Sequence, residues 1–152
     1  MKRSILYMAA LALIFLGGRG TDIGSLRPVE VVQLTEKAGI LMLETDTADQ
    51  GWGLTVEQAV AKLKETTPGQ IYLDTADFLL VEEGLESCLL KMDAYLKKGT
   101  RIAYVSEGVD LKSAAEYLRI HKPSATMKDG QKPMDKLSLE GGRMNLKKFQ
   151  EN

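Results

Sequence analysis

The regular pattern of the chain begins with two apolar runs separated by a tight turn. Residues 29–35 alternate roughly between apolar and polar side chains, and residues 40–43 are continuously apolar. Ala38 and Gly39 lie between them and are typical of a turn, so the pattern predicts a β-hairpin. Residues 47–53 are then expected to form a loop.

A second pattern places apolar residues three and four positions apart and predicts three helices. The first covers residues 55–66, with Thr55 as its N-cap and a glutamine three residues later that completes a capping box. The second covers residues 83–98, with glutamates at its start, two lysines at its end and a glycine after it. The third covers residues 111–120, behind the capping residue Asp110.

Residues 69–77, between the first two helices, are predicted to hold the central strand. Pro68 ends the preceding helix, and residues 71–73 are β-branched, aromatic and apolar, as a buried strand prefers. The four residues that follow are turn-like, and the apolar run 78–81 is expected to pack on the same core. Residues 101–105 are the last predicted strand of this unit.

The predicted order is therefore β-β-α-β-α-β-α, an α/β fold. Strand–helix–strand units predict parallel pairing with right-handed crossovers, and the opening hairpin makes the sheet mixed. We expect a largely parallel, four-stranded sheet with helices packed on it. Near the C-terminus, Gly141 and Gly142 separate two alternating segments, which fits either a β-hairpin or a flexible tail.

The N-terminus has the pattern of an export signal. Lys2 and Arg3 precede residues 4–18, which are uncharged and mostly apolar and are short for a membrane-spanning helix. Gly18 and Gly20 permit cleavage near residue 20, and an uncleaved signal-anchor is the alternative. We expect an exported protein, either secreted or held on the cytoplasmic membrane by residues 4–18, with its domain facing outward.

Length and composition fit one globular domain. The 152 residues are 44% apolar and 27% charged. We divide them into a signal peptide or signal-anchor (1–20), a linker (21–28), an α/β domain (29–121) and a basic tail or hairpin (122–152). Residues 21–121 hold ten basic and 17 acidic side chains, which argues against nucleic-acid binding.

Four aspartates in two turn-like segments are the candidate metal ligands. Asp74 and Asp77 follow the predicted central strand, and ligands of open α/β sheets bind beyond the carboxyl ends of strands. Asp46 and Asp49 belong to a second copy of the same tetrapeptide, D-T-A-D. A hard cation needs several converging carboxylates, but aspartate in a turn also accepts hydrogen bonds from the backbone. We favour the turn role and keep the cation site as the alternative.

Trp52 is the candidate contact residue for a partner or ligand. It lies in Gly51-Trp52-Gly53, and Val56 stands where a dinucleotide-binding fingerprint would need its third glycine. Trp52 is expected to anchor the loop on the core or to contact a partner. The single cysteine, Cys88, is interpreted as structural and the single histidine, His121, as a helix-capping residue, so we predict no catalytic residues and no cofactor.

Three segments within residues 53–118 carry a family resemblance: G-L-T-V-E-Q-A-V-A-K-L, Q-I-Y-L-D-T-A-D-F-L-L-V-E-E-G-L-E-S-C-L-L-K-M-D and R-I-A-Y-V-S-E-G-V-D-L-K-S-A-A-E-Y-L. Their order resembles the N-terminal domain of the C-subunit of bacterial spore germinant receptors. That family is lipidated on a cysteine directly after its signal, and here the residues directly after the apolar stretch include no cysteine. The phrase L-D-T-A-D-F-L-L-V also resembles small exported proteins of spore-forming bacteria. The resemblance implies a location and assigns no functional residues.

These observations favour a non-enzymatic extracytoplasmic interaction module, with a protein of the spore or cell envelope or of the membrane as its partner. The first alternative is a metal-dependent hydrolase or cation-binding domain that uses the four aspartates. The second alternative is a small-ligand-binding domain with Trp52 in the pocket wall.

Overall fold

The computed structural model describes residues 26–129 and 132–150, and this part of the chain forms ten strands and three α-helices. The fold is mixed α/β, as predicted. The strands are β1 Leu26–Pro28, β2 Val31–Lys37, β3 Ile40–Thr45, β4 Gln50–Gly53, β5 Gln70–Tyr72, β6 Phe78–Val81, β7 Arg101–Val105, β8 Ala125–Thr126, β9 Asp135–Glu140 and β10 Arg143–Lys148. The helices are α2 Val56–Thr66, α3 Leu89–Met92 and α4 Leu111–Ile120, and short 3-10 turns lie at η2 Leu73–Thr75, η3 Glu86–Cys88 and η4 Met127–Asp129.

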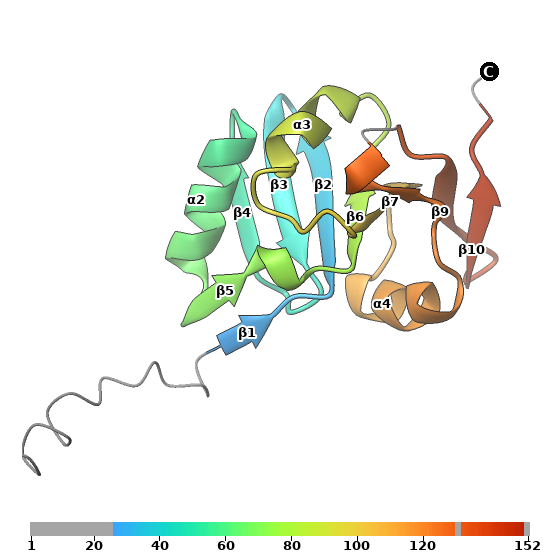
Figure 1. Cartoon of the computed structure of the whole chain (residues 1–152), viewed down its shortest axis with the longest axis horizontal. Helices are drawn as coiled ribbons and strands as arrows, with labels where there is room; N and C mark the ends of the chain where they lie inside the picture. The colour runs from blue at the N-terminus through green and yellow to red at the C-terminus, as the bar shows by residue number, and fades with distance from the viewer. Residues whose placement is uncertain (1–25, 130–131, 151–152) are drawn as a thin grey trace, which may run out of the picture.

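The main sheet runs across the molecule in the order β10-β9-β7-β6-β2-β3-β4, with β8 paired to β7 (Figure 1). Strands β2, β6, β7 and β9 are parallel neighbours, whereas β3, β4 and β10 are antiparallel additions at the two sides. The prediction of a mixed sheet holds. The predicted four-stranded sheet is wrong, because residues 50–53 add an edge strand and the C-terminal hairpin pairs with β7.

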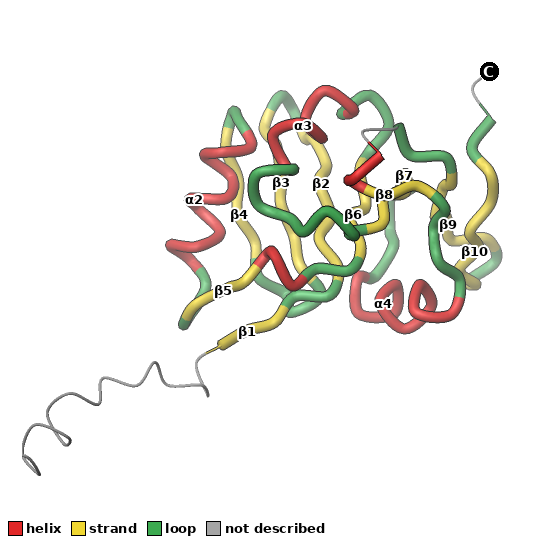
Figure 2. Tube along the Cα trace, viewed as in Figure 1, coloured by secondary structure: helices red, strands yellow, loops and turns green. Residues whose placement is uncertain are grey.

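Helices cover the two faces of the sheet unequally. Apolar residues of α2 and of the α3 region pack with alternate residues of β2, β3, β6 and β7 on one face. On the other face, α4 packs with the intervening residues of β2, β6 and β7 and with Leu137 of β9. Figure 2 shows the three helices as separate red coils around the yellow strands. We call the face under α2 and α3 the two-helix face, and the face under α4 the one-helix face.

The central strand of the sheet is β6 and not the segment around residues 71–73. All four residues of β6 are buried, and parallel neighbours flank it on both sides, which explains why its sequence is continuously apolar. Residues 70–72 form β5, which pairs only with β1 in a separate two-stranded ribbon. The prediction that residues 71–73 form the central strand was wrong. Residues 71–73 and 78–81 are both short apolar runs, and only the run that the fold buries on both faces becomes the central strand.

The second predicted helix is much shorter than residues 83–98. Gly84 has a φ of +93°, a left-handed conformation that is incompatible with the start of a helix there. The segment then continues as the turn η3, the single-turn helix α3 and further turns. Leu85, Met92 and Leu96 are nevertheless buried, so the apolar side of the segment was identified correctly.

The remaining predicted elements agree with the structure. Thr55 caps α2 by accepting from the Gln58 N–H at 3.3 Å, and Asp110 caps α4 by accepting from the Ser113 N–H at 2.8 Å. The opening hairpin is formed by β2 and β3, and the alternative of a C-terminal hairpin is realised by β9 and β10. Two segments expected to be irregular contain short strands, β1 within the linker and β8 within residues 123–133.

The predicted signal peptide or signal-anchor, residues 1–20, lies outside the described residues. No helix within 26–129 and 132–150 is long and apolar enough to cross a membrane.

Candidate functional site

Asp46 and Asp49 lie in the turn between β3 and β4, and both serve the turn itself. Asp46 Oδ1 accepts hydrogen bonds from the backbone N–H groups of Glu30 at 3.0 Å and Val31 at 3.1 Å, where the chain enters β2. Asp49 is buried and forms an ion pair with Arg27 at 2.9 Å, and its Oδ2 accepts from the Thr47 hydroxyl at 2.6 Å. These contacts hold the β3–β4 turn against β1 and the start of β2.

Asp74 and Asp77 follow the carboxyl end of β5, as expected, but β5 is not part of the main sheet. Asp74 is exposed in η2, and Asp77 immediately precedes β6, so both lie at the amino end of the central strand. Asp77 Oδ1 accepts from Lys97 Nζ at 2.5 Å. Across residues 26–129 and 132–150, no group of three or more His, Cys, Asp or Glu side chains could hold a metal ion.

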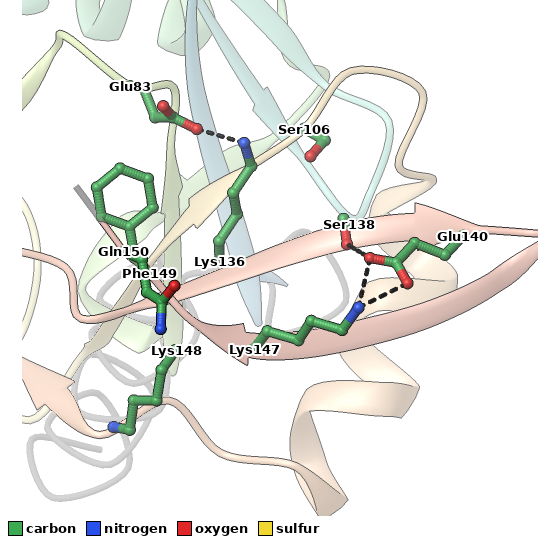
Figure 3. Close-up of a pocket in the computed structure, with 9 residues that line it drawn as sticks. All are labelled: Glu83, Ser106, Lys136, Ser138, Glu140, Lys147, Lys148, Phe149 and Gln150. Carbon is green, nitrogen blue, oxygen red and sulfur yellow. Dashed lines mark hydrogen bonds and ion pairs between the residues drawn. The ribbon is translucent and has the colours of Figure 1, made fainter. Parts of the chain in front are cut away.

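The carboxyl ends of the parallel strands, where ligands of open α/β sheets bind, carry two hollows. The first is an open cleft of about 580 Å³ between the ends of β6 and β7 and the β9–β10 hairpin. Its side chains are drawn in Figure 3, in which Lys136 reaches toward Glu83 and Lys147 toward Glu140. Phe149 and Gln150 complete the lining.

The chemistry of this first cleft is that of a solvated surface. Lys147 pairs with Glu140 at 2.8 Å, and that interaction lowers the pKa of the Glu140 carboxyl. Both side chains are more than half exposed, so water screens this ion pair and it adds little to the free energy of folding. Neither His121 nor Cys88, the one histidine and the one cysteine of the chain, lines the cleft. The Ser138 hydroxyl donates to Glu140 at 3.3 Å, and that carboxylate is already paired with Lys147, so the cleft offers polar contacts.

The second hollow, which we call the acidic groove, has a volume of about 380 Å³. It lies between the ends of β2, β6 and β7 and the loop that precedes α4. Its lining includes four glutamates and a single lysine: Glu36, Glu44, Glu82, Glu107 and Lys37. The Glu82 carboxylate is held in place because it accepts the Glu36 N–H at 2.6 Å.

Trp52 belongs to β4, an edge strand, and the glycines on both sides of it have a packing role. A Cβ on Gly51 would lie 2.2 Å from the Ala59 carbonyl oxygen, and one on Gly53 would lie 2.4 Å from Gln58 Cβ. Gly-Trp-Gly is therefore a strand whose glycines let helix α2 approach closely. The expected loop was wrong; the alternation of small and large residues was the signal that could have revealed a strand.

The side chain of Trp52 points to the face opposite α2 and is 45% exposed. In the sheet, Trp52 lies opposite Met42, and Met42 lies opposite Thr35 of β2. Side chains alternate between the two faces along a strand, so Thr35 is on the same face as Val31, which is buried under α4. Trp52 is thus on the one-helix face, beyond the area that α4 covers. Lys62 Nζ lies 5.4 Å from the centroid of its ring.

Trp52 is one of several large apolar side chains exposed in this region. Ile40 is 41% exposed, Met42 is half-buried, and Leu54, directly after β4, is 73% exposed. We call the part of the one-helix face formed by β3 and β4 the open face. It adjoins the acidic groove, because Glu44, which lines the groove, is on β3 two residues from Met42. Trp52 is therefore not the core anchor that was first considered.

Cys88 and His121 have structural surroundings. Cys88 is half-buried against the core of the two-helix face, and burial raises the pKa of its thiol. His121 ends α4, and its ring stacks on Tyr117 with 4.4 Å between the ring centroids. Within residues 26–129 and 132–150, these two side chains make packing contacts, and neither group is paired with an acid or base that would activate it.

Comparisons of this chain with models of protein families, with curated proteins and with solved structures found no match.

Proposed function

We propose that this protein is a non-enzymatic interaction module that works outside the cytoplasm and binds a protein partner through the open face. The observation that carries the proposal is the uncovered area of sheet beside α4, where Trp52 and Ile40 are exposed on neighbouring strands. Large apolar side chains gathered on one surface are typical of protein-binding sites, and tryptophan is enriched among the residues that dominate binding energy.

The location in this proposal rests on the sequence of residues 1–20, which has the pattern of a signal peptide or signal-anchor. The partner would then be a protein of the membrane or of the cell or spore envelope. Residues 4–18 would hold the module on the cytoplasmic membrane if the signal is not cleaved.

The metal-dependent alternative has less support. Asp46 is occupied by the backbone N–H groups at the start of β2, Asp49 is paired with Arg27 of β1, and Asp77 is paired with Lys97. Turnover of phosphate esters or peptides by the purified protein with added Mg²⁺ or Mn²⁺ would contradict the non-enzymatic proposal.

In-cell photocrosslinking tests the interaction directly. A photoreactive amino acid at Leu54 lies beside the open face, and the same group at Glu116, exposed on α4, is the control. The proposal expects a reproducible crosslinked product from position 54 in the envelope fraction, its loss in a Trp52→Ala background, and no such product from position 116. Identical products from both positions, or a product unaffected by Trp52→Ala, would refute it.

A further inference from the structure

We infer that the open face and the acidic groove together form one docking surface for a basic amphipathic helix of a partner protein. This inference rests on the proposed function and adds the chemistry of the partner. Three properties of the surface lead to it: its charge, the protection of its edge and the space beside α4.

The charge of the surface requires a basic partner. The acidic groove holds four glutamates against one lysine. Glu44 lies on β3 between the groove and the apolar residues, and its carboxylate accepts from the Gln50 side chain at 2.7 Å. Glu107 is exposed at the far rim, in the loop before α4. A partner segment with apolar side chains along one side and lysines or arginines along the margin would match this arrangement.

The edge of β4 disfavours a partner that adds a strand to the sheet. β4 is only four residues long, and the outward-facing carbonyl of Gln50 already accepts from the Thr66 hydroxyl of α2 at 2.8 Å. Because outward-facing residues alternate along an edge strand, Trp52 and the N–H of Gln50 are the main groups left to pair with an added strand, which is a short ladder. Recognition through the face, by side chains, is therefore favoured over β-strand addition.

The open face has the form that a helix fits. On the two-helix face, α2 lies over β3 and β4 and the α3 region lies over the strands beside them. On the one-helix face, α4 covers β2, β6 and β7, and β3 and β4 have no helix of the described chain above them. A partner helix beside α4 would complete this layer. Its apolar side would cover Ile40, Met42 and Trp52, and its basic margin would face the acidic groove.

The test measures the binding of designed peptides to the full chain. A fluorescently labelled amphipathic helix built from leucine and lysine is compared with its leucine–glutamate twin and with a lysine–leucine peptide whose sequence is scrambled. Anisotropy gives the affinity. The emission of Trp52, the only tryptophan in the chain, reports whether the peptide covers this position. We expect saturable binding of the basic helix with a blue shift of the emission, and at least tenfold weaker binding of both other peptides.

Matched variants separate specific docking from general attraction of positive charge. Glu44→Gln with Glu107→Gln removes two charges from the surface and is expected to weaken binding about tenfold. Asp74→Asn with Glu116→Gln removes two exposed charges elsewhere and is expected to leave the affinity unchanged. Equal losses in the two double variants, or equal binding of the acidic twin, would overturn the inference.

The outcomes also separate this inference from the proposed function. A Trp52-dependent crosslink from position 54 without binding of the basic helix would uphold the interaction module and refute the helix chemistry. Sedimentation of the full chain tests a second alternative. A dimer that Trp52→Ala dissociates would assign the surface to a second copy of this chain and would also refute the helix chemistry. Failure of both the crosslinking and the peptide experiment would refute the function and the inference together.

Discussion

Gly51→Ala tests the explanation of the Gly-Trp-Gly segment. The added Cβ would lie 2.2 Å from the Ala59 carbonyl oxygen, 2.5 Å from the Leu63 nitrogen and 2.6 Å from Leu63 Cβ. The first two are backbone atoms of α2, so no change of side-chain rotamer can relieve the contacts. The helix or the edge strand must move instead, and the buried packing of Ala59 and Leu63 is lost in part.

The expected cost is about 3 kcal/mol, at the upper end of the range for overpacking a well-filled core. Ordinary domains have a total stability of about 5–15 kcal/mol, so the variant should fold but unfold earlier in urea. Far-UV circular dichroism is the suitable probe, because it follows the whole fold and does not depend on Trp52, which neighbours the substitution.

Gly99→Ala provides the matched control. A Cβ at Gly99 has no heavy atom within 4 Å, and its φ is not in the left-handed range. This variant should be as stable as the parent or gain about 0.5 kcal/mol from the reduced freedom of the unfolded chain. A Gly51→Ala protein as stable as Gly99→Ala would show that α2 does not rest on β4 as described.

Three further predictions address the turns and caps. Asp46→Ala leaves two backbone N–H groups at the start of β2 without their acceptor and should cost about 2 kcal/mol in urea unfolding; an unchanged midpoint would contradict this role. Thr55→Ala removes the cap of α2 and should cost about 1 kcal/mol in the same assay, with Thr55→Ser expected to retain most of the stability. Burial opposes ionisation of Asp135, but hydrogen bonds from the Ser124 hydroxyl and N–H and from Lys148 outweigh it, so the pKa of this carboxyl is lowered in the fold. Asp135 therefore stabilises the fold above the ordinary pKa of an aspartate, and this stabilisation is lost as the pH falls through the lowered pKa of the folded state. Asp135→Asn should make the free energy of unfolding decline less steeply between about pH 5 and pH 2. Equal declines in the variant and the parent would contradict this role.

Local signals predicted the elements that local interactions decide. The cap residues of α2 and α4 act within a few residues and were identified from the sequence, and the turn at Gly141-Gly142 realises one of the two alternatives that the sequence left open there. The left-handed φ of Gly84 also acts locally, yet a glycine in an otherwise helical pattern did not reveal that the helix would be interrupted.

The sequence named a candidate residue for the site, Trp52, but could not predict the surface on which it lies. The sequence left Trp52 as either a core anchor or a contact residue, because tryptophan is both large and apolar and enriched at interfaces, and its exposure depends on the width of the sheet. α4 covers β2, β6 and β7, and among the described residues no helix lies over β3 and β4 on that side. Both copies of the repeated tetrapeptide lie near the amino ends of β2 and β6, but their carboxylates bond to different groups: Asp46 to the backbone at the start of β2, Asp49 to Arg27 and Asp77 to Lys97.

The sequence by itself determined the α/β class, the opening hairpin and two of the helices, because apolar periodicity and helix caps depend on neighbouring residues; for the C-terminal segment it left a hairpin and a flexible tail open. Only the tertiary structure decided that residues 78–81 and not 71–73 form the central strand, since burial on both faces depends on β2 and β7 on either side. It also decided that Gly51 must be glycine, because the atoms that exclude a Cβ there belong to α2, which packs against β4 in the folded protein. The open face and the acidic groove arise in the same way, from strands that meet across the sheet and from a helix layer that covers only part of it.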